Sequence, residues 1–174
     1  MSDIKAKNKS NDTRISTLLR EIAEKAKTAS QKLARTGTEA RNKALLGMAQ
    51  GLIDNAPYIL EENAKDLSGA AAKRLSGAMT DRLRLDEARL EKIALGLREV
   101  AALPDPVGEV VRMWRRPNGL QVGRMRIPLG VIAIIYESRP NVTADAAGLC
   151  VKSGNAVILR GGSETIRTNV AIGE

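Results

Sequence analysis

Residues 130–159, GVIAIIYESRPNVTADAAGLCVKSGNAVIL, hold two apolar runs with an amphipathic stretch between them. The runs at 130–136 and 156–159 do not alternate polar with apolar residues, which is typical of strands buried on both faces of a sheet. The stretch from about Thr143 to Lys152 predicts a helix, and Ser153-Gly154-Asn155 ends it. This order of strand, helix and strand predicts the start of a doubly wound parallel α/β sheet.

The part of the chain after the second run continues this pattern. A polar loop occupies 160–164, and another helix begins near Thr165. Two parallel strands alone do not make a stable sheet, and no helix-ending signal precedes Glu174. We therefore expect residues 128–174 to form the first strand–helix–strand part of an α/β domain, truncated before the sheet is complete.

A hairpin is predicted immediately upstream, at residues 107–127. Two strand-like segments, 107–114 and 120–127, flank Pro117-Asn118-Gly119, which supplies the dihedral angles of a tight turn. Arginines lie within both segments, and charges of this kind suit an edge ribbon better than a central strand. We expect an antiparallel ribbon that projects from the α/β domain.

Helical patterns fill most of the first hundred residues. Apolar residues recur at helical spacing from Thr13 to Ala34, from about Glu39 to Asp54, from Pro57 to about Leu67, and after a capping Asp86 until Pro104. We therefore expect residues 13–106 to form a helical part. Residues 1–12 are polar, and we expect a disordered leader there.

Composition excludes several classes of site. The 174 residues contain no histidine, so the chain offers no Ser-His-Asp triad and no histidine-containing zinc site, and we expect no metal site. The one cysteine, Cys150, forms no internal disulfide, which fits a reducing cytoplasm. The N-terminus is too polar for a secretory signal, and no apolar run approaches the ~20 residues of a membrane helix. We expect a cytoplasmic protein that does not insert into membranes.

The formal net charge of +8 raises the question of nucleic-acid binding. Most of the excess lies in residues 1–50, with 11 basic and 5 acidic side chains. Aromatic residues for stacking on bases are scarce, because the chain has one Trp, two Tyr and no Phe. A solvated helical surface is the better interpretation, so we expect no nucleic-acid partner.

Several segments resemble the γ-glutamyl phosphate reductase family. The long matching segments are MWRRPNGLQVGRMRIPLGVIAIIYESRPNVTADAAGLC at 113–150 and VKSGNAVILRGGSE at 151–164. Shorter ones are ENAKDL at 62–67, DRLRL at 81–85 and VAALPDPVGEV at 100–110. The family belongs to the aldehyde dehydrogenase superfamily, so the resemblance implies that fold, with residues 107–127 as an oligomerisation hairpin and residues 128–174 as part of an NADP-binding domain.

The resemblance also implies an activity. It is the reduction of L-glutamyl 5-phosphate by NADPH to L-glutamate 5-semialdehyde and phosphate, a step of proline biosynthesis, carried out by a homo-oligomer. In such enzymes a thiolate attacks the acyl carbon, and hydride from the cofactor reduces the resulting thioester. The nucleophilic cysteine of the family would lie downstream of Glu174. We expect Cys150, in the apolar helix before Lys152, to be an inert packing residue and the 174-residue chain to be inactive.

Two loops are the candidate site. The superfamily places an oxyanion-stabilising asparagine in the loop that corresponds to 137–141. Asn141 matches it by residue type, whereas an ungapped count along the strand reaches Arg139. We assign Asn141 to the oxyanion and Arg139 to phosphate contact, although without the resemblance Arg139-Pro140-Asn141 would be interpreted as a plain helix cap.

The second loop corresponds to the segment with which the superfamily binds the adenosine ribose. The implied cofactor-binding residues are Arg160, Gly161, Ser163 and Glu164. Here arginine replaces the lysine of the superfamily, a double glycine replaces its proline, and the segment is one residue longer. A guanidinium beside free backbone amides suits a 2′-phosphate, and a simple tight turn remains the alternative.

Three other functions remain open at this point. The chain could be part of another aldehyde or acyl reductase of the same superfamily, which the nucleophile segment would distinguish. It could be a non-catalytic assembly module that keeps the hairpin and lacks the chemistry. A basic nucleic-acid-binding domain is the third alternative, and it would bind in a strongly salt-dependent manner.

Overall fold

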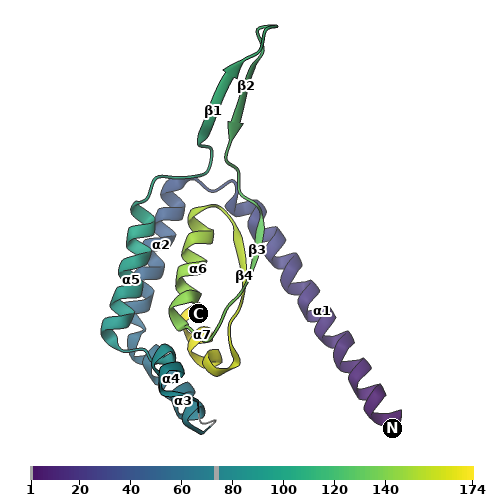
Figure 1. Ribbon diagram of the computed structural model, residues 1–174, viewed down its shortest axis with the longest axis vertical. Helices are drawn as coiled ribbons and strands as arrows, with labels where there is room; N and C mark the ends of the chain where they lie inside the picture. Colours follow the sequence, from purple (N-terminus) through teal and green to yellow (C-terminus); the bar gives the residue numbers. More distant parts are fainter. Residues whose placement is uncertain (1, 73–74) are drawn as a thin grey trace.

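The computed structural model describes residues 2–72 and 75–174, and Figure 1 shows their arrangement. The helices are α1 (Ser2–Leu33), α2 (Thr38–Asp54), α3 (Ala56–Ala72), α4 (Gly77–Leu83), α5 (Glu87–Ala102), α6 (Pro140–Lys152), the 3-10 turn η1 (Ser163–Thr165) and α7 (Ile166–Gly173). The strands are β1 (Val110–Arg115), β2 (Gln121–Met125), β3 (Val131–Ile135) and β4 (Ala156–Arg160). The predicted mixture of helices, hairpin and parallel strands is confirmed.

The parallel pair β3–β4 is the centre of the molecule. Val131 lies opposite Ala156 and Ile135 opposite Arg160, with α6 as the crossover. Helix α6 covers one face of the pair, and the C-terminal part of α1 packs against the other (Figure 1). The prediction that β3 is buried on both faces is wrong for this chain. Its residues alternate between exposed and half-buried, and Ile135 is 78% exposed, because the described residues supply too few neighbouring strands and helices to cover it.

The turn from α6 into β4 fixes the spacing of this unit. Gly154 has a φ of +73°, which glycine adopts without strain. The amide of Asn155 donates to the Cys150 carbonyl at 2.8 Å, and that of Gly154 to Val151 at 3.1 Å, as in a Schellman cap. The predicted end of the helix at 153–155 is confirmed.

The main core lies between the helices. Helix α2 packs along α5, and both pack on α6, while α3 packs on α7. Leu45, Leu90 and Leu97 are fully enclosed where these helices meet. Figure 1 shows α2 and α5 as one layer beside α6. Burial of such side chains contributes roughly 1.5–3 kcal/mol each.

The hairpin forms as predicted. Strands β1 and β2 pair antiparallel, with Trp114 opposite Val122. Gly119 closes the turn with a φ of +85°. All of β1 is exposed, and Figure 1 shows the ribbon projecting from the end of the molecule opposite α3 and α4.

The N-terminal half differs from the expectations in three places. The disordered leader predicted at 1–12 is wrong for residues 2–12, because α1 begins at Ser2 and no glycine or proline interrupts the chain before Leu33. Residue 1 lies outside the described residues. Helix α3 continues five residues past Leu67, and α4 was not predicted at all. No helix in the described part of the chain has the length and apolarity to cross a membrane.

A buried ion pair joins α2 to the segment that leads into the hairpin. The Arg41 guanidinium, 3% exposed, donates to the carboxylate of Asp105. The hydroxyl of Thr38 and the amide of Val107, the latter at 2.9 Å, donate to the same carboxylate. Asp105 therefore fixes the root of the hairpin against the first turns of α2.

Candidate active site

A groove of about 580 Å³ lies at the carboxyl ends of β3 and β4. Parallel strands bring the loops that follow them to one edge of the sheet, which is where open α/β sheets bind ligands. The loop after β3 contributes Tyr136, Glu137 and Ser138, and the loop after β4 contributes Gly162 and Glu164. Helix α4 forms the facing wall. Two loops that the sequence singled out are thus brought together.

The carboxylate of Glu164 ties the two loops to each other. It accepts a hydrogen bond from Ser138 Oγ at 2.7 Å and one from Ser163 Oγ at 2.9 Å. The close approach depends on Gly162, because a Cβ there would lie 2.1 Å from Ser138 Oγ. Gly161 has a different constraint, since its Cβ would lie 2.3 Å from Asn169 Nδ2 of α7 and 3.1 Å from the Tyr136 ring. Gly162 therefore lets the second loop approach the first, and Gly161 lets it approach α7.

A chain of hydroxyl and amide groups supports these loops from behind. Tyr136 and Thr143 share a hydrogen bond of 2.7 Å between their hydroxyls, and Thr143 Oγ1 donates to Asn169 Oδ1 at 3.0 Å. Asn169 Nδ2 then donates to Thr165 Oγ1 at 3.1 Å. The end of β3, the first turns of α6 and the start of α7 are thereby held in one arrangement.

The predicted cofactor residues lie at this groove in different ways. Arg160 is exposed and lines it, and its backbone carbonyl accepts from the Tyr136 amide at 3.1 Å. Glu164 also lines it. Ser163 is exposed and holds Glu164, and Gly161 is half-buried beneath the loop. The arrangement offers a guanidinium, a carboxylate and hydroxyls to a polar ligand.

The two predicted catalytic residues lie outside that groove. Asn141 is in the first turn of α6, because the helix starts at Pro140, and its Nδ2 donates to Asp145 Oδ2 at 3.0 Å. It lines a second groove of about 320 Å³, between α4, α5 and the start of α6. Arg139 is the exposed N-cap residue of α6, and it is not among the described residues that line either groove.

Arg82 is the residue that sequence reasoning missed. It lies on α4, lines both grooves, and its Nη1 is 3.9 Å from Glu137 Oε2. A helix-start signal was present in the sequence, because the Ser76 hydroxyl accepts from the Met79 amide at 3.3 Å as an N-cap. Seven residues are too few for a clear periodic pattern, so the helix was overlooked.

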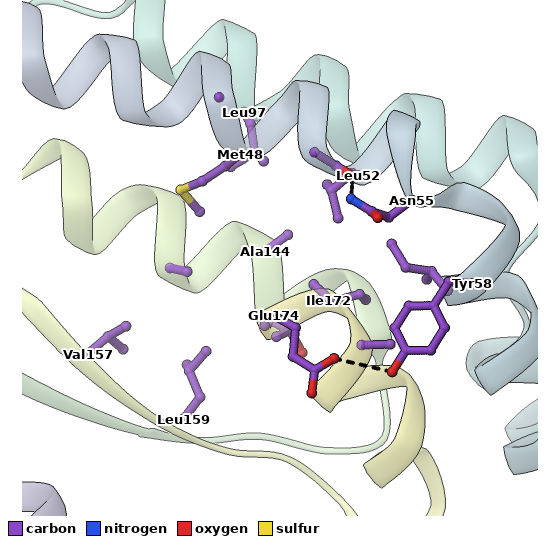
Figure 2. A pocket seen from close by; sticks show the side chains of 17 residues that line it. Met48, Leu52, Asn55, Tyr58, Leu97, Ala144, Val157, Leu159, Ile172 and Glu174 are labelled. Atoms are coloured by element: carbon purple, nitrogen blue, oxygen red, sulfur yellow. Dashed lines mark hydrogen bonds between the residues drawn. The ribbon is translucent and has the colours of Figure 1, made fainter.

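A larger cavity, about 760 Å³, lies elsewhere, between α2 and α3 on one side and α6 and α7 on the other. Figure 2 shows mainly apolar side chains around it, among them Met48, Leu52 and Leu159. At its edge Tyr58 donates to Glu174 Oε2 at 3.2 Å. This hydrogen bond and the charge of Glu174 raise the pKa of Tyr58, so the phenol stays protonated and is no base at neutral pH. No described cluster of Cys, Asp or Glu here or elsewhere fits a metal ion.

Cys150 is 4% exposed and lies near the end of α6. Ten residues of helix separate it from Pro140, about 15 Å at the usual rise. Burial raises the pKa of its thiol, so the group is protonated at neutral pH. Cys150 therefore lies away from the loop at 137–141, in a buried position that suits the packing residue expected from the sequence.

We expect the Cys150 thiol to react with DTNB on the order of tenfold or more slowly in the folded chain than in urea, because the thiol is both buried and protonated. Stopped-flow absorbance measures both rates. A folded-state rate close to that in urea would show that the thiol is accessible.

The curated proteins that this chain resembles include several γ-glutamyl phosphate reductases. The chain is 61% identical over 158 residues to the γ-glutamyl phosphate reductase of Geobacter metallireducens, covering 91% of this chain and 38% of that protein. It is 63% identical over 154 residues to the γ-glutamyl phosphate reductase of Geotalea daltonii, covering 88% of this chain and 37% of that protein. Over most of its length the chain is similar to the first part of γ-glutamyl phosphate reductases. It spans little more than a third of the length of these relatives.

Solved structures of the γ-glutamyl phosphate reductase family have the same fold. The Thermotoga maritima enzyme superposes with a TM-score of 0.85 at 41% identity, covering 88% of this chain and 37% of that one. The Saccharomyces cerevisiae enzyme superposes with a TM-score of 0.81 at 37% identity, covering 85% of this chain and 38% of that one. A putative aldehyde dehydrogenase from Bacillus subtilis gives 0.65 at 21% identity, covering 90% and 32%, which shows the aldehyde-dehydrogenase-like fold alone. No family model matches the sequence.

Proposed function

We propose that the protein to which residues 1–174 belong reduces L-glutamyl 5-phosphate with NADPH, giving L-glutamate 5-semialdehyde and phosphate for proline biosynthesis. The observation that carries this proposal is the groove at the ends of β3 and β4, in a chain 61% identical to a γ-glutamyl phosphate reductase. This chain would supply the first part of the cofactor site, and the nucleophilic cysteine would come from outside it. A cytoplasmic location fits the reducing conditions that a catalytic thiol needs.

The cofactor would lie in the groove of Arg160 and Glu164. Its volume of about 580 Å³ is within the range of small-molecule sites. NADPH bound there supplies the hydride for the reduction. The exposed Arg160 guanidinium would pair with the 2′-phosphate, which favours NADPH over NADH. Gly161 and Ser163 would keep the loop backbone close to the ribose while Glu164 anchors it to Ser138.

The start of α6 would face the reacting end of the substrate. The amide of Asn141 would stabilise the developing oxyanion with the Nδ2 proton that Asp145 leaves free. Arg139, next to it, would contact the phosphate. The role of Asn141 requires substrate to approach from the second groove, which Arg82 connects to the first.

The hairpin would join copies of the protein into a homo-oligomer. Both of its strands and their ends expose large apolar side chains, at Val111, Met113, Leu120, Met125 and Ile127. Exposed apolar surface of this kind is typical of an interface.

A chimaera tests the proposed reaction. The 158 aligned residues of this chain replace their counterparts in the Geobacter metallireducens reductase, which supplies the remaining two thirds. We expect the chimaera to form NADPH from glutamate 5-semialdehyde, phosphate and NADP⁺ with a kcat/KM within about tenfold of the parent, and to be slower with NAD⁺. The 174-residue chain alone is the control, and we expect no turnover from it because it lacks a placed thiolate.

The alternatives give other outcomes. A folded chimaera without turnover would favour the non-catalytic assembly module. Turnover that is faster with another aldehyde than with glutamate 5-semialdehyde would favour a different reductase of the superfamily.

A further inference from the structure

We infer that the second groove, between α4, α5 and the start of α6, binds an anionic oxygen group of the substrate through Arg84 and Lys92. The inference rests on the proposed function, because the substrate carries both a phosphoryl group and a carboxylate. The groove has a volume of about 320 Å³, which is enough for either group with its neighbouring carbons.

The charges lining the groove are unbalanced. Four basic side chains line it, and Asp145 is the one acidic residue among the described lining residues. Arg89 is already neutralised, since its Nη2 is 3.0 Å from Asp81 and its Nε is 3.9 Å from Asp86. Arg84 and Lys92 have no ion pair with any residue in the described part of the chain. A concave surface with this excess concentrates the field and attracts anions.

Arg89 also shapes the groove through the backbone. Its Nη1 donates to the Asp81 carbonyl at 2.7 Å and to the Arg84 carbonyl at 2.8 Å. The guanidinium therefore holds the end of α4 and the following loop together. Arg89 therefore has a structural role in this groove, and Arg84 and Lys92 are the cations that would contact the anion.

A buried asparagine fixes the backbone on both sides of Arg84. Asn63, which is 1% exposed, donates from Nδ2 to the Leu83 carbonyl at 2.8 Å and accepts at Oδ1 from the Leu85 amide at 2.9 Å. Leu83 and Leu85 are themselves buried. Because the backbone is already ordered, an anion bound by Arg84 would not have to order the loop, and more of the interaction energy would appear as affinity.

The second groove adjoins the cofactor groove. Arg82 lines both, and Asn141 at the start of α6 lines the second. Helix α6 has 13 residues and no side-chain hydrogen bond at its N-cap, so the positive end of its dipole adds to the field of the cations. A substrate whose anionic group is held in this groove would lie beside Asn141.

Direct titration of the 174-residue chain tests the inference without any turnover. Inorganic phosphate and L-glutamate are added separately at constant ionic strength and followed by ¹⁵N–¹H NMR. We expect one or both probes to shift the amides of Arg84, Lys92 and Asn141. In the double variant Arg84→Gln, Lys92→Gln the apparent Kd should rise about tenfold or more. Both side chains are exposed, so the variant should stay folded, which its unshifted spectrum would verify.

The matched control is Arg98→Gln, which removes an exposed cation from α5 outside the groove. We expect its Kd to stay within about twofold of the original, since exposed charges at a distance are screened. Absence of binding by both probes, or equal binding by the double variant and the control, would overturn the inference.

The chimaera identifies the group that is bound, because phosphate and semialdehyde are separate substrates in the reverse reaction. A rise in KM for phosphate in the double variant assigns the groove to the phosphoryl group, and a rise in KM for the semialdehyde assigns it to the carboxylate. An active chimaera together with a chain that binds neither probe would refute this inference alone. An inactive chimaera together with a chain that binds them would refute the proposed function alone.

Discussion

Replacing Asp105 with alanine is expected to lower the free energy of unfolding of the chain by about 3 kcal/mol, because it leaves a buried cation without its partner. The Arg41 guanidinium is 3% exposed, and its Nε and Nη1 already have no hydrogen-bond partner among the described residues. Asp105 is also the acceptor for Thr38 and for the Val107 amide. Asp105 is 18% exposed, so water can partly replace it, which places the effect at the lower end of the usual range for such pairs.

The stabilisation by Asp105 should depend on pH in a defined direction. Burial acts to raise the pKa of its carboxyl, but the hydrogen bonds from Thr38 and Val107 and the charge of Arg41 outweigh it and hold the pKa below its ordinary value. A carboxyl with a lowered pKa in the folded state stabilises that state fully above its unfolded pKa of about 3.9. The contribution is lost as the pH falls through the lower, folded value.

Urea unfolding followed by circular dichroism at pH 7 and at several values below pH 4 measures both effects. The control is Glu109→Ala, which removes an exposed ion pair with Arg126 of 3.2 Å near the same hairpin. We expect that variant to lose less than about 1 kcal/mol. Equal losses in the two variants, or a difference that persists unchanged at the lowest pH, would contradict the assignment of Asp105.

The local elements of this fold were predictable because their signals lie within a few residues of one another. The turn at 117–119 predicted the hairpin, and Ser153-Gly154-Asn155 predicted the end of α6. Asp86 predicted the start of α5, and its carboxylate accepts from the Arg89 amide at 2.8 Å. In each case a backbone requirement is satisfied by the residue itself, so no distant contact is needed.

The burial of strand and helix faces was not predictable in the same way. The apolar run at 130–136 predicts a doubly covered strand, yet Ile135 stays exposed because the described residues cover one side of β3 incompletely. The apolar stripe of α1 is also left partly uncovered, since Leu18 is 56% exposed and Leu19 is 58% exposed. An apolar pattern records which surface a chain can bury, and what covers it depends on the rest of the fold.

The candidate site shows the same distinction between local and distant signals. Placing loops 137–138 and 160–164 together follows from the parallel strand order. Pro140 at the first position of α6 was a signal that Asn141 is helical, since proline favours that position. The division of the site into two grooves depends on α4, which comes from residues more than fifty positions upstream of Asn141. No spacing in the sequence reports where that helix packs.

The largest effect on catalysis is expected from Gly162→Ala in the chimaera, where we expect kcat/KM to fall by about 100-fold. The added Cβ would lie 2.1 Å from Ser138 Oγ and 3.2 Å from Ser138 Cβ, so a rotation of the hydroxyl alone does not relieve the overlap. Rotation would also break the 2.7 Å hydrogen bond to Glu164. The loops at 136–138 and 160–164 must therefore move apart, and a displacement of about 1 Å at a reacting centre costs about two orders of magnitude.

Backbone strain does not contribute to this effect, because the φ of −65° at Gly162 suits alanine. The substitution therefore adds only side-chain volume. Gly96→Ala in α5 is the matched control, since nothing lies within 4 Å of its Cβ. We expect it to raise the free energy of unfolding by about 0.5–1 kcal/mol and to leave kcat/KM within about twofold of the chimaera. NADPH formation from glutamate 5-semialdehyde and phosphate measures the rates, and thermal unfolding checks that both variants are folded. A folded Gly162→Ala variant with the full rate would mean that the spacing of the two loops has no part in positioning the cofactor.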